Sequence, residues 1–193
     1  WTRPYAYYRR MLQLWQWRNP RQRWLLKAPS HLNYLPILFD VFPDARVLFT
    51  HRDPVQAQAS LVDLAGTIFW MRSDKPMRVA AFEGLLSPEA MAARLDRIIG
   101  WLEGGAIPKG QCASSLYADL IANPLEAVRR VYERCELAFT DETERRVRAY
   151  LAKKPQGKFG AHAYGVAESE DLRRRRRLFA RYQAFFGVPD EAG

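Results

Sequence analysis

The chain has 193 residues, of which 48% are hydrophobic and 26% charged, so we expect one globular domain over residues 1–193 and exclude a mainly disordered protein. No apolar run approaches the roughly 18 residues that a membrane-spanning helix needs, so no transmembrane segment is expected. The net charge of +9 favours anionic partners, but it falls to +4 without the run Arg173 to Arg177.

The hydrophobic pattern alternates between short apolar runs rich in strand formers and longer stretches with apolar residues every three or four positions. The expected strands are 24–26, 46–50 and 113–117. The expected helices are 5–17, 32–42, 53–65, two that begin at 87 and 123, and finally 141–153 and 168–186. Alternation of strands and helices is typical of parallel βαβ units, so the predicted fold class is helix-rich α/β with a parallel sheet.

Three of the expected helices begin with the same local signal. Asp53, Ser87 and Asn123 are each followed by a proline. A short polar side chain can cap the first N–H groups of a helix, and proline suits the first helical position because its missing N–H would be unpaired there anyway.

The two cysteines, Cys112 and Cys135, are too few for a disulfide framework and predict a reducing, cytoplasmic location. No group of Cys and His has the spacing of metal ligands, so no metal site is predicted. The sequence begins at Trp1 without Met or a signal peptide, and three strands are few for a parallel sheet. We therefore expect a piece of a longer protein, with further strands before Trp1.

Candidate site residues follow the expected strands, because ligands of parallel sheets bind beyond the carboxyl ends of the strands. Arg52 follows the second strand, and its guanidinium can donate paired N–H groups to a phosphate at a capped helix start. Ser60 lies seven residues after Asp53, on the same helix face, so one phosphate can contact Arg52 and Ser60 together. In the alternative interpretation Arg52 pairs with a neighbouring carboxylate and Ser60 is a small packing residue.

Lys27 and His31 follow the first expected strand. A histidine titrates near neutral pH and can act as a general base, and Lys27 can stabilise developing negative charge. The alternative for His31 is a structural hydrogen bond at a helix start. His51 is interpreted as structural, and His162, in a glycine-containing loop, stays undecided.

Taken together, these residues resemble a known family. The stretch WLLKAPSH is followed by FPDAR and by an Arg-Asp-Pro turn with Ser60 eight residues after Arg52. This pattern resembles the bacterial-type branch of the sulfotransferases that use 3′-phosphoadenosine-5′-phosphosulfate (PAPS). Two later stretches, LYADLIANPL from Leu116 and KFGAHAYG from Lys158, are similar to the family's Tyr-Glu-Asp-Leu segment and its basic glycine loop.

The resemblance implies roles for the nucleotide-binding residues. Arg52 and Ser60 would bind the 3′-phosphate, Tyr117 would contact the adenine, and Lys158 with Gly160 would close over the nucleotide. The implied fold is the sulfotransferase version of the P-loop-kinase-like α/β fold.

The resemblance also implies the chemistry. His31 would deprotonate the acceptor hydroxyl, and Lys27 would neutralise charge on the transferring sulfuryl group, without a metal. The acceptor would be a carbohydrate, lipid or other small hydroxyl compound.

The sequence departs from the family at two points. Lys27 and His31 are four residues apart, further than in the cytosolic animal enzymes. The family's Gly/Ser/Thr-rich loop for the 5′-phosphosulfate is not in the sequence. We expect this loop before Trp1, and the alternative is a relative that binds a nucleotide without transferring anything.

The run Arg173 to Arg177 raises the alternative of a basic module that binds RNA or anionic surfaces. Five consecutive helical residues sweep about 400°, so they cannot form one basic face. Arg175 and Arg176 point the same way as Leu172 and Phe179, so at least one must snorkel or meet an acidic partner or a ligand phosphate. We interpret the run as a solvated surface with one or two ion pairs. Because RNP, KH and helix-turn-helix signatures are lacking, no nucleic-acid partner is expected.

Overall fold

The computed structural model describes residues 2–154 and 169–191. Helices dominate this part of the chain, with short 3₁₀ helices (η) and two strands between them. In chain order the elements are α1 (Thr2–Gln16), η1 (Pro29–Asn33), α2 (Leu35–Val41), β1 (Val47–His51), α3 (Pro54–Trp70), η2 (Val79–Phe82), α4 (Glu83–Leu86), α5 (Pro88–Glu103), η3 (Lys109–Gln111), β2 (Cys112–Leu116), α6 (Tyr117–Ala122), α7 (Pro124–Arg134), α8 (Asp141–Lys153) and α9 (Glu170–Phe186).

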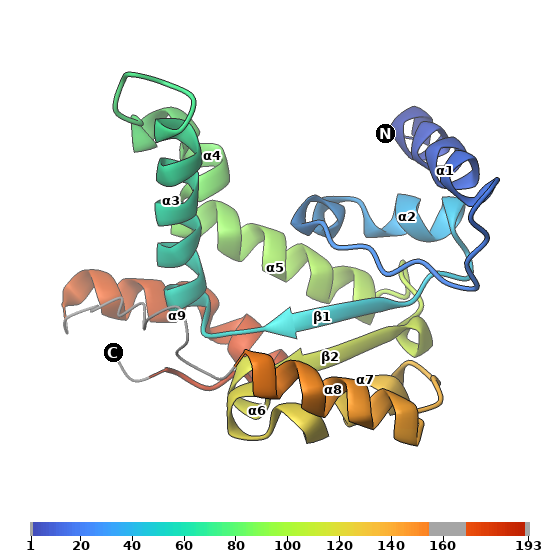
Figure 1. The fold of residues 1–193 in the computed structure, drawn as a ribbon. Helices are drawn as coiled ribbons and strands as arrows, with labels where there is room; N and C mark the ends of the chain where they lie inside the picture. Colours follow the sequence, from blue (N-terminus) through green and yellow to red (C-terminus); the bar gives the residue numbers. More distant parts are fainter. Residues whose placement is uncertain (1, 155–168, 192–193) are drawn as a thin grey trace.

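The two strands form a parallel pair at the centre of the fold (Figure 1). Their register pairs Val47 with Cys112 and His51 with Leu116, so the carboxyl ends of both strands lie at the same edge. In Figure 1, α5 lies on one side of the pair and α6, α7 and α8 lie on the other. The helix-rich α/β class with a parallel sheet is confirmed.

The expected strand at residues 24–26 is wrong. These residues form neither helix nor strand, and Leu25 is 99% exposed. A run of three apolar residues becomes a strand only when another strand pairs with it, and the described residues place none beside it. The other two strands are found within one residue of their expected bounds.

The capping signals are confirmed at all three predicted sites. Oδ1 of Asp53 accepts the N–H of Val55 at the start of α3, and the side chains of Ser87 and Asn123 cap α5 and α7 in the same way. Each helix has proline in its first turn. The signal at Asp53 therefore fixes the start of α3, directly after the carboxyl end of β1.

Two expected helices differ most in extent from the prediction, while α1 begins three residues earlier and α9 two residues later than expected. The helix expected over residues 32–42 is divided into η1 and α2, because Pro36 has no N–H to donate to the carbonyl of Leu32 and therefore suits the first turn of a new helix. The α3 helix continues past Ala65 to Trp70.

Helix α5 organises the core. Its buried residues face β1, α9 and the segment after α9. Three clusters result: Leu35, Phe39, Phe49, Ile98, Leu102 and Ile107; Val55, Ala92, Leu172 and Phe179; and Ile99, Tyr182 and Val188. The last two clusters fasten α9 against α5 and the start of α3, beside the carboxyl edge of the sheet.

Candidate functional site

The strand register brings two predicted site residues together. Because His51 pairs with Leu116, the next residue on each strand, Arg52 and Tyr117, emerges at the same edge. The Arg52 guanidinium carbon lies 4.5 Å from the centre of the Tyr117 ring, which is a cation–π contact. A flat cation stacked on an aromatic ring offers a phosphate its N–H groups and a base its ring face.

Arg52 also holds a carboxylate through its paired donors. Its Nε donates to Oε1 of Glu191 at 2.9 Å, and its Nη2 donates to Oε2 at 2.8 Å. The alternative that Arg52 pairs with a carboxylate is therefore confirmed, with a partner 139 positions along the chain. The contact also shows that the guanidinium is oriented for an anion with two parallel oxygens.

The carboxylate of Asp53, the residue after Arg52, accepts four hydrogen bonds. Its side chain is 0% exposed and accepts two bonds from Arg176, at 2.7 and 2.8 Å. It also accepts the main-chain N–H groups of Val55 and Glu191. Burial by itself raises the pKa of Asp53, but the hydrogen bonds from Arg176, Glu191 and Val55 outweigh it and lower that pKa below its ordinary value.

The arginine run has more ion pairs than the one or two expected. Each of the five arginines contacts a carboxylate. Four are exposed or half-buried pairs of the kind that contribute little, and Arg176 on Asp53 is the buried exception. Of the three alternatives for Arg175 or Arg176, which were snorkelling, an acidic partner or a ligand phosphate, the structure shows an acidic partner for Arg176.

His51 is the last residue of β1, directly before Arg52, and is buried. Its Nδ1 is hydrogen-bonded to the Tyr182 hydroxyl at 2.7 Å and its Nε2 to Ser114 Oγ at 2.9 Å. The ring stacks on Phe186, with the ring centres 4.2 Å apart. Burial lowers the pKa of His51 to about 4. Because both nitrogens are occupied and the ring is neutral at pH 7, the structural interpretation of His51 is supported.

His31 lies on η1 and has a partner that the sequence did not suggest. Its Nδ1 is hydrogen-bonded to the hydroxyl of Tyr5 at 2.8 Å, and the ring lies beside Tyr5 and Tyr8. Partial burial lowers the pKa of His31 from its ordinary value, which favours the neutral imidazole. Lys27 is exposed and lies four residues before His31, ahead of η1.

The other predicted site residues are placed as follows. Ser60 lies on α3, two turns after its capped start, and is partly exposed. Lys158, Gly160 and His162 lie outside the described residues.

Sequence reasoning missed two partners, Tyr5 and Glu191. Tyr5 is 26 positions from His31, and Glu191 is 139 positions from Arg52. No local pattern marks such pairs, because only the packing of α1 and of the segment after α9 brings them close.

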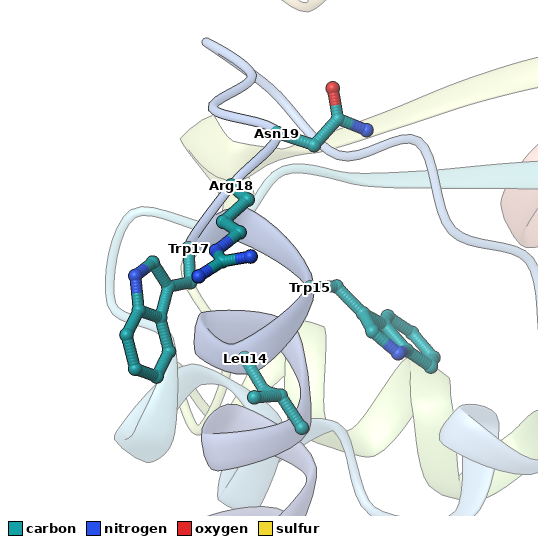
Figure 2. A pocket seen from close by; sticks show the side chains of 5 residues that line it. All are labelled: Leu14, Trp15, Trp17, Arg18 and Asn19. Carbon is teal, nitrogen blue, oxygen red and sulfur yellow. The ribbon is translucent and has the colours of Figure 1, made fainter.

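A separate pocket lies at the C-terminal end of α1 (Figure 2). Leu14, Trp15, Trp17, Arg18 and Asn19 line it, and none of them is a predicted site residue. In Figure 2 the rings of Trp15 and Trp17 point to opposite sides of the helix end.

Within residues 2–154 and 169–191, no group of three or more His, Cys, Asp or Glu side chains is arranged to hold a metal ion. No described helix is both long and apolar enough to span a bilayer. Cys112 and Cys135 are both free thiols.

Comparison with known proteins identifies the family. The model of the Sulfotransferase family matches residues 2–141. The chain belongs to the sulfotransferase family. The fold of this sulfotransferase is similar to the crystal structure of sulfotransferase STF9 from Mycobacterium avium, with a TM-score of 0.75 and 30% sequence identity. That match covers 98% of this chain and 48% of that chain, so the chain spans about half the length of the solved relative. No curated protein sequence matches it.

Proposed function

We propose that this sulfotransferase transfers a sulfuryl group from PAPS to a hydroxyl group of an acceptor. One observation carries the proposal beyond family membership: the Arg52 guanidinium stacks on Tyr117 at the carboxyl edge of the parallel strands. This is the edge at which α/β proteins bind their ligands.

The residues at this edge fit the nucleotide part of PAPS. The Arg52 donors already hold a carboxylate in a two-pronged geometry, and the same fork suits two oxygens of a 3′-phosphate. Ser60 adds a hydroxyl to the 3′-phosphate from α3, and the ring of Tyr117 lies against the adenine. Lys158 and Gly160, which lie outside the described residues, are assigned to the nucleotide from the family resemblance. The 3′-phosphate is remote from the reacting sulfur, so these residues bind and orient the donor.

His31 is the proposed base, and Tyr5 is the residue that positions it. If Nδ1–H of His31 donates to the Tyr5 hydroxyl, Nε2 carries the lone pair that takes the acceptor proton. The lowered pKa favours the neutral ring, which is the form that a general base requires.

In the proposed transfer step, His31 acts as the base between the two substrates. As Nε2 of His31 takes the hydroxyl proton, the acceptor oxygen bonds to sulfur and the bond from sulfur to the bridging phosphate oxygen breaks. The products are the sulfated acceptor and adenosine 3′,5′-bisphosphate. As in phosphoryl transfer, charge spreads over the equatorial oxygens, so Lys27 contributes by placing a cation near them.

The acceptor is proposed as a carbohydrate, lipid or other small hydroxyl compound. The segment that we assign to its binding runs from Ala65 to Leu86. Trp70 and Met71, at the end of α3, are more than two-thirds exposed and give this segment an apolar surface.

The alternative of an RNA-binding module loses its main support. Each arginine of the run Arg173 to Arg177 contacts a carboxylate of the same chain. A phosphate backbone would have to displace those carboxylates, which lowers the gain from each contact.

A turnover assay with a base variant tests the proposal. The intact protein is incubated with PAPS and a panel of hydroxyl compounds, and formation of adenosine 3′,5′-bisphosphate and of a sulfated product is followed. His31→Ala should abolish acceptor-dependent turnover, while the affinity for adenosine 3′,5′-bisphosphate stays within about twofold, since the base is remote from the 3′-phosphate. A His31→Ala variant with unchanged turnover would refute the assignment of the base.

A further inference from the structure

The paired donors Nε and Nη2 of Arg52, called the Arg52 fork below, already bind a side chain of the same chain. Glu191 approaches it with both carboxylate oxygens, at 2.8 to 3.0 Å from Nε and Nη2. Two parallel N–H···O bonds are the arrangement in which arginine also binds phosphate. In this structure a carboxylate therefore stands where the proposed function places a 3′-phosphate.

The segment that carries Glu191 is held at this position. After α9 the chain turns at Gly187, which has the left-handed φ of 65°, and Val188 is buried against α5 and α9. The side chain of Gln183 donates to the carbonyl of Val188 and to Oδ1 of Asp190. These contacts direct the following residues back toward the carboxyl edge of the sheet.

A second anchor lies at Glu191 itself. Its main-chain N–H donates to Oδ2 of Asp53 at 2.8 Å, and Asp53 is in turn fixed by Arg176. The anchor uses the main chain, whereas the contact with Arg52 uses the side chain. The side chain of Glu191 is 25% exposed, so it can rotate into solvent while the main-chain bond to Asp53 stays in place.

We propose that Glu191 is an internal competitor of the 3′-phosphate at Arg52. The inference rests on the proposed function, in which Arg52 binds that phosphate. One guanidinium cannot give the same two donors to both groups, so the nucleotide binds only after the Glu191 carboxylate has left. A phosphate dianion carries more charge than a carboxylate and takes the fork at sufficient concentration.

The consequence is a lower affinity for every ligand with a 3′-phosphate. The free energy of the Arg52–Glu191 pair is subtracted from that of nucleotide binding, for PAPS and for adenosine 3′,5′-bisphosphate alike. Glu191 thereby raises the concentration at which either nucleotide occupies the site and leaves the ratio of their affinities unchanged. A nucleotide that lacks the 3′-phosphate does not need the fork and is not affected.

The test compares two neighbouring carboxylates. Glu191→Gln removes the charge that contacts Arg52, and Asp190→Asn removes the same charge one residue earlier, where the side chain contacts Arg176 and Gln183. In calorimetric titrations of the intact protein, Glu191→Gln should tighten binding of adenosine 3′,5′-bisphosphate about fivefold, which corresponds to about 1 kcal/mol. Binding of 5′-AMP should stay unchanged, and Asp190→Asn should change binding of the bisphosphate less than about twofold.

Arg52→Ala separates failure of this inference from failure of the proposed function. If Arg52→Ala leaves the preference for the bisphosphate over 5′-AMP intact, the 3′-phosphate assignment itself is wrong. If Arg52→Ala removes that preference but Glu191→Gln and Asp190→Asn behave alike, Glu191 is no competitor and the assignment of Arg52 stands. Glu191→Ala serves as a second variant, with melting curves as a check on folding, and should also tighten binding of the bisphosphate. Weaker binding in a folded Glu191→Ala variant would overturn the inference.

Discussion

Replacing Arg176 by methionine should destabilise this sulfotransferase far more than any other change in the arginine run. Methionine retains most of the apolar stem of the side chain but removes both donors to Asp53, whose side chain is fully buried. Removing one partner of a buried ion pair typically costs about 3–5 kcal/mol. Here Arg176 is 24% exposed, and two main-chain N–H groups still bind the carboxylate, so we expect a loss of about 2–3 kcal/mol.

The pH dependence gives this prediction a second readout. The folded-state pKa of Asp53 is lowered, so its stabilising contribution is complete above its unfolded pKa of about 4 and is lost as the pH falls through its folded pKa. The difference between the wild type and Arg176→Met should therefore be largest near pH 7 and should narrow below about pH 4. The free energy of unfolding is measured by urea denaturation across this range.

A matched variant completes the experiment. Arg173→Met lies on the same helix and removes the same charge, but Arg173 is exposed and its carboxylate partner, Glu170, lies 3.7 Å away. It should change the free energy of unfolding by less than about 0.5 kcal/mol. Equal losses for Arg173→Met and Arg176→Met would refute the argument that the buried carboxylate determines the cost.

Three further predictions concern single side chains. The pKa of His51 is about 4 in the fold and about 6.5 in the unfolded chain, so stability should fall by up to about 3 kcal/mol between pH 6.5 and pH 4, and urea denaturation should show this loss disappearing in a folded His51→Gln variant. Tyr5→Phe should lower kcat about tenfold or more and leave nucleotide affinity unchanged. The control Tyr8→Phe removes a hydroxyl that does not position His31, so kcat should stay within about twofold of the wild type. Equal kcat values for the two variants in turnover assays would contradict the role of Tyr5. Gly187→Ala should destabilise the protein by about 1 kcal/mol in thermal melts, because an alanine at a φ of 65° is strained, and an unchanged melting temperature would count against this turn.

Local signals in the sequence predict the parts of the fold that depend on neighbours along the chain. Asp53, Ser87 and Asn123 cap helices as predicted, since each bond joins residues two or three positions apart. The strand β1 follows from its run of apolar and β-branched residues, whereas β2 has two serines and no β-branched residue, so its composition gives less signal. The apolar run at residues 24–26 fails as a strand because pairing depends on a partner strand, which its own composition cannot supply.

The candidate site likewise has a part that could be predicted from the sequence and a part that could not. Arg52 and Tyr117 could be expected at one edge, because both follow strands of a parallel sheet. Their surroundings could not be predicted, because Glu191 reaches Arg52 only through the turn after α9. The pattern of the arginine run left snorkelling, an acidic partner or a ligand phosphate open for Arg175 or Arg176, and only the structure shows that Arg176 binds Asp53.

The central claim is that Arg52 and Tyr117 form the site for a nucleotide with a 3′-phosphate. The most direct measurement is calorimetric titration of the intact protein with adenosine 3′,5′-bisphosphate and with 5′-AMP, in the wild type and in Arg52→Ala. We predict a preference of at least about tenfold for the bisphosphate in the wild type, and its loss in Arg52→Ala, because a charge-assisted two-pronged contact typically contributes about 1.5–3 kcal/mol. Equal weakening of both nucleotides in Arg52→Ala, or no preference in the wild type, would contradict the claim.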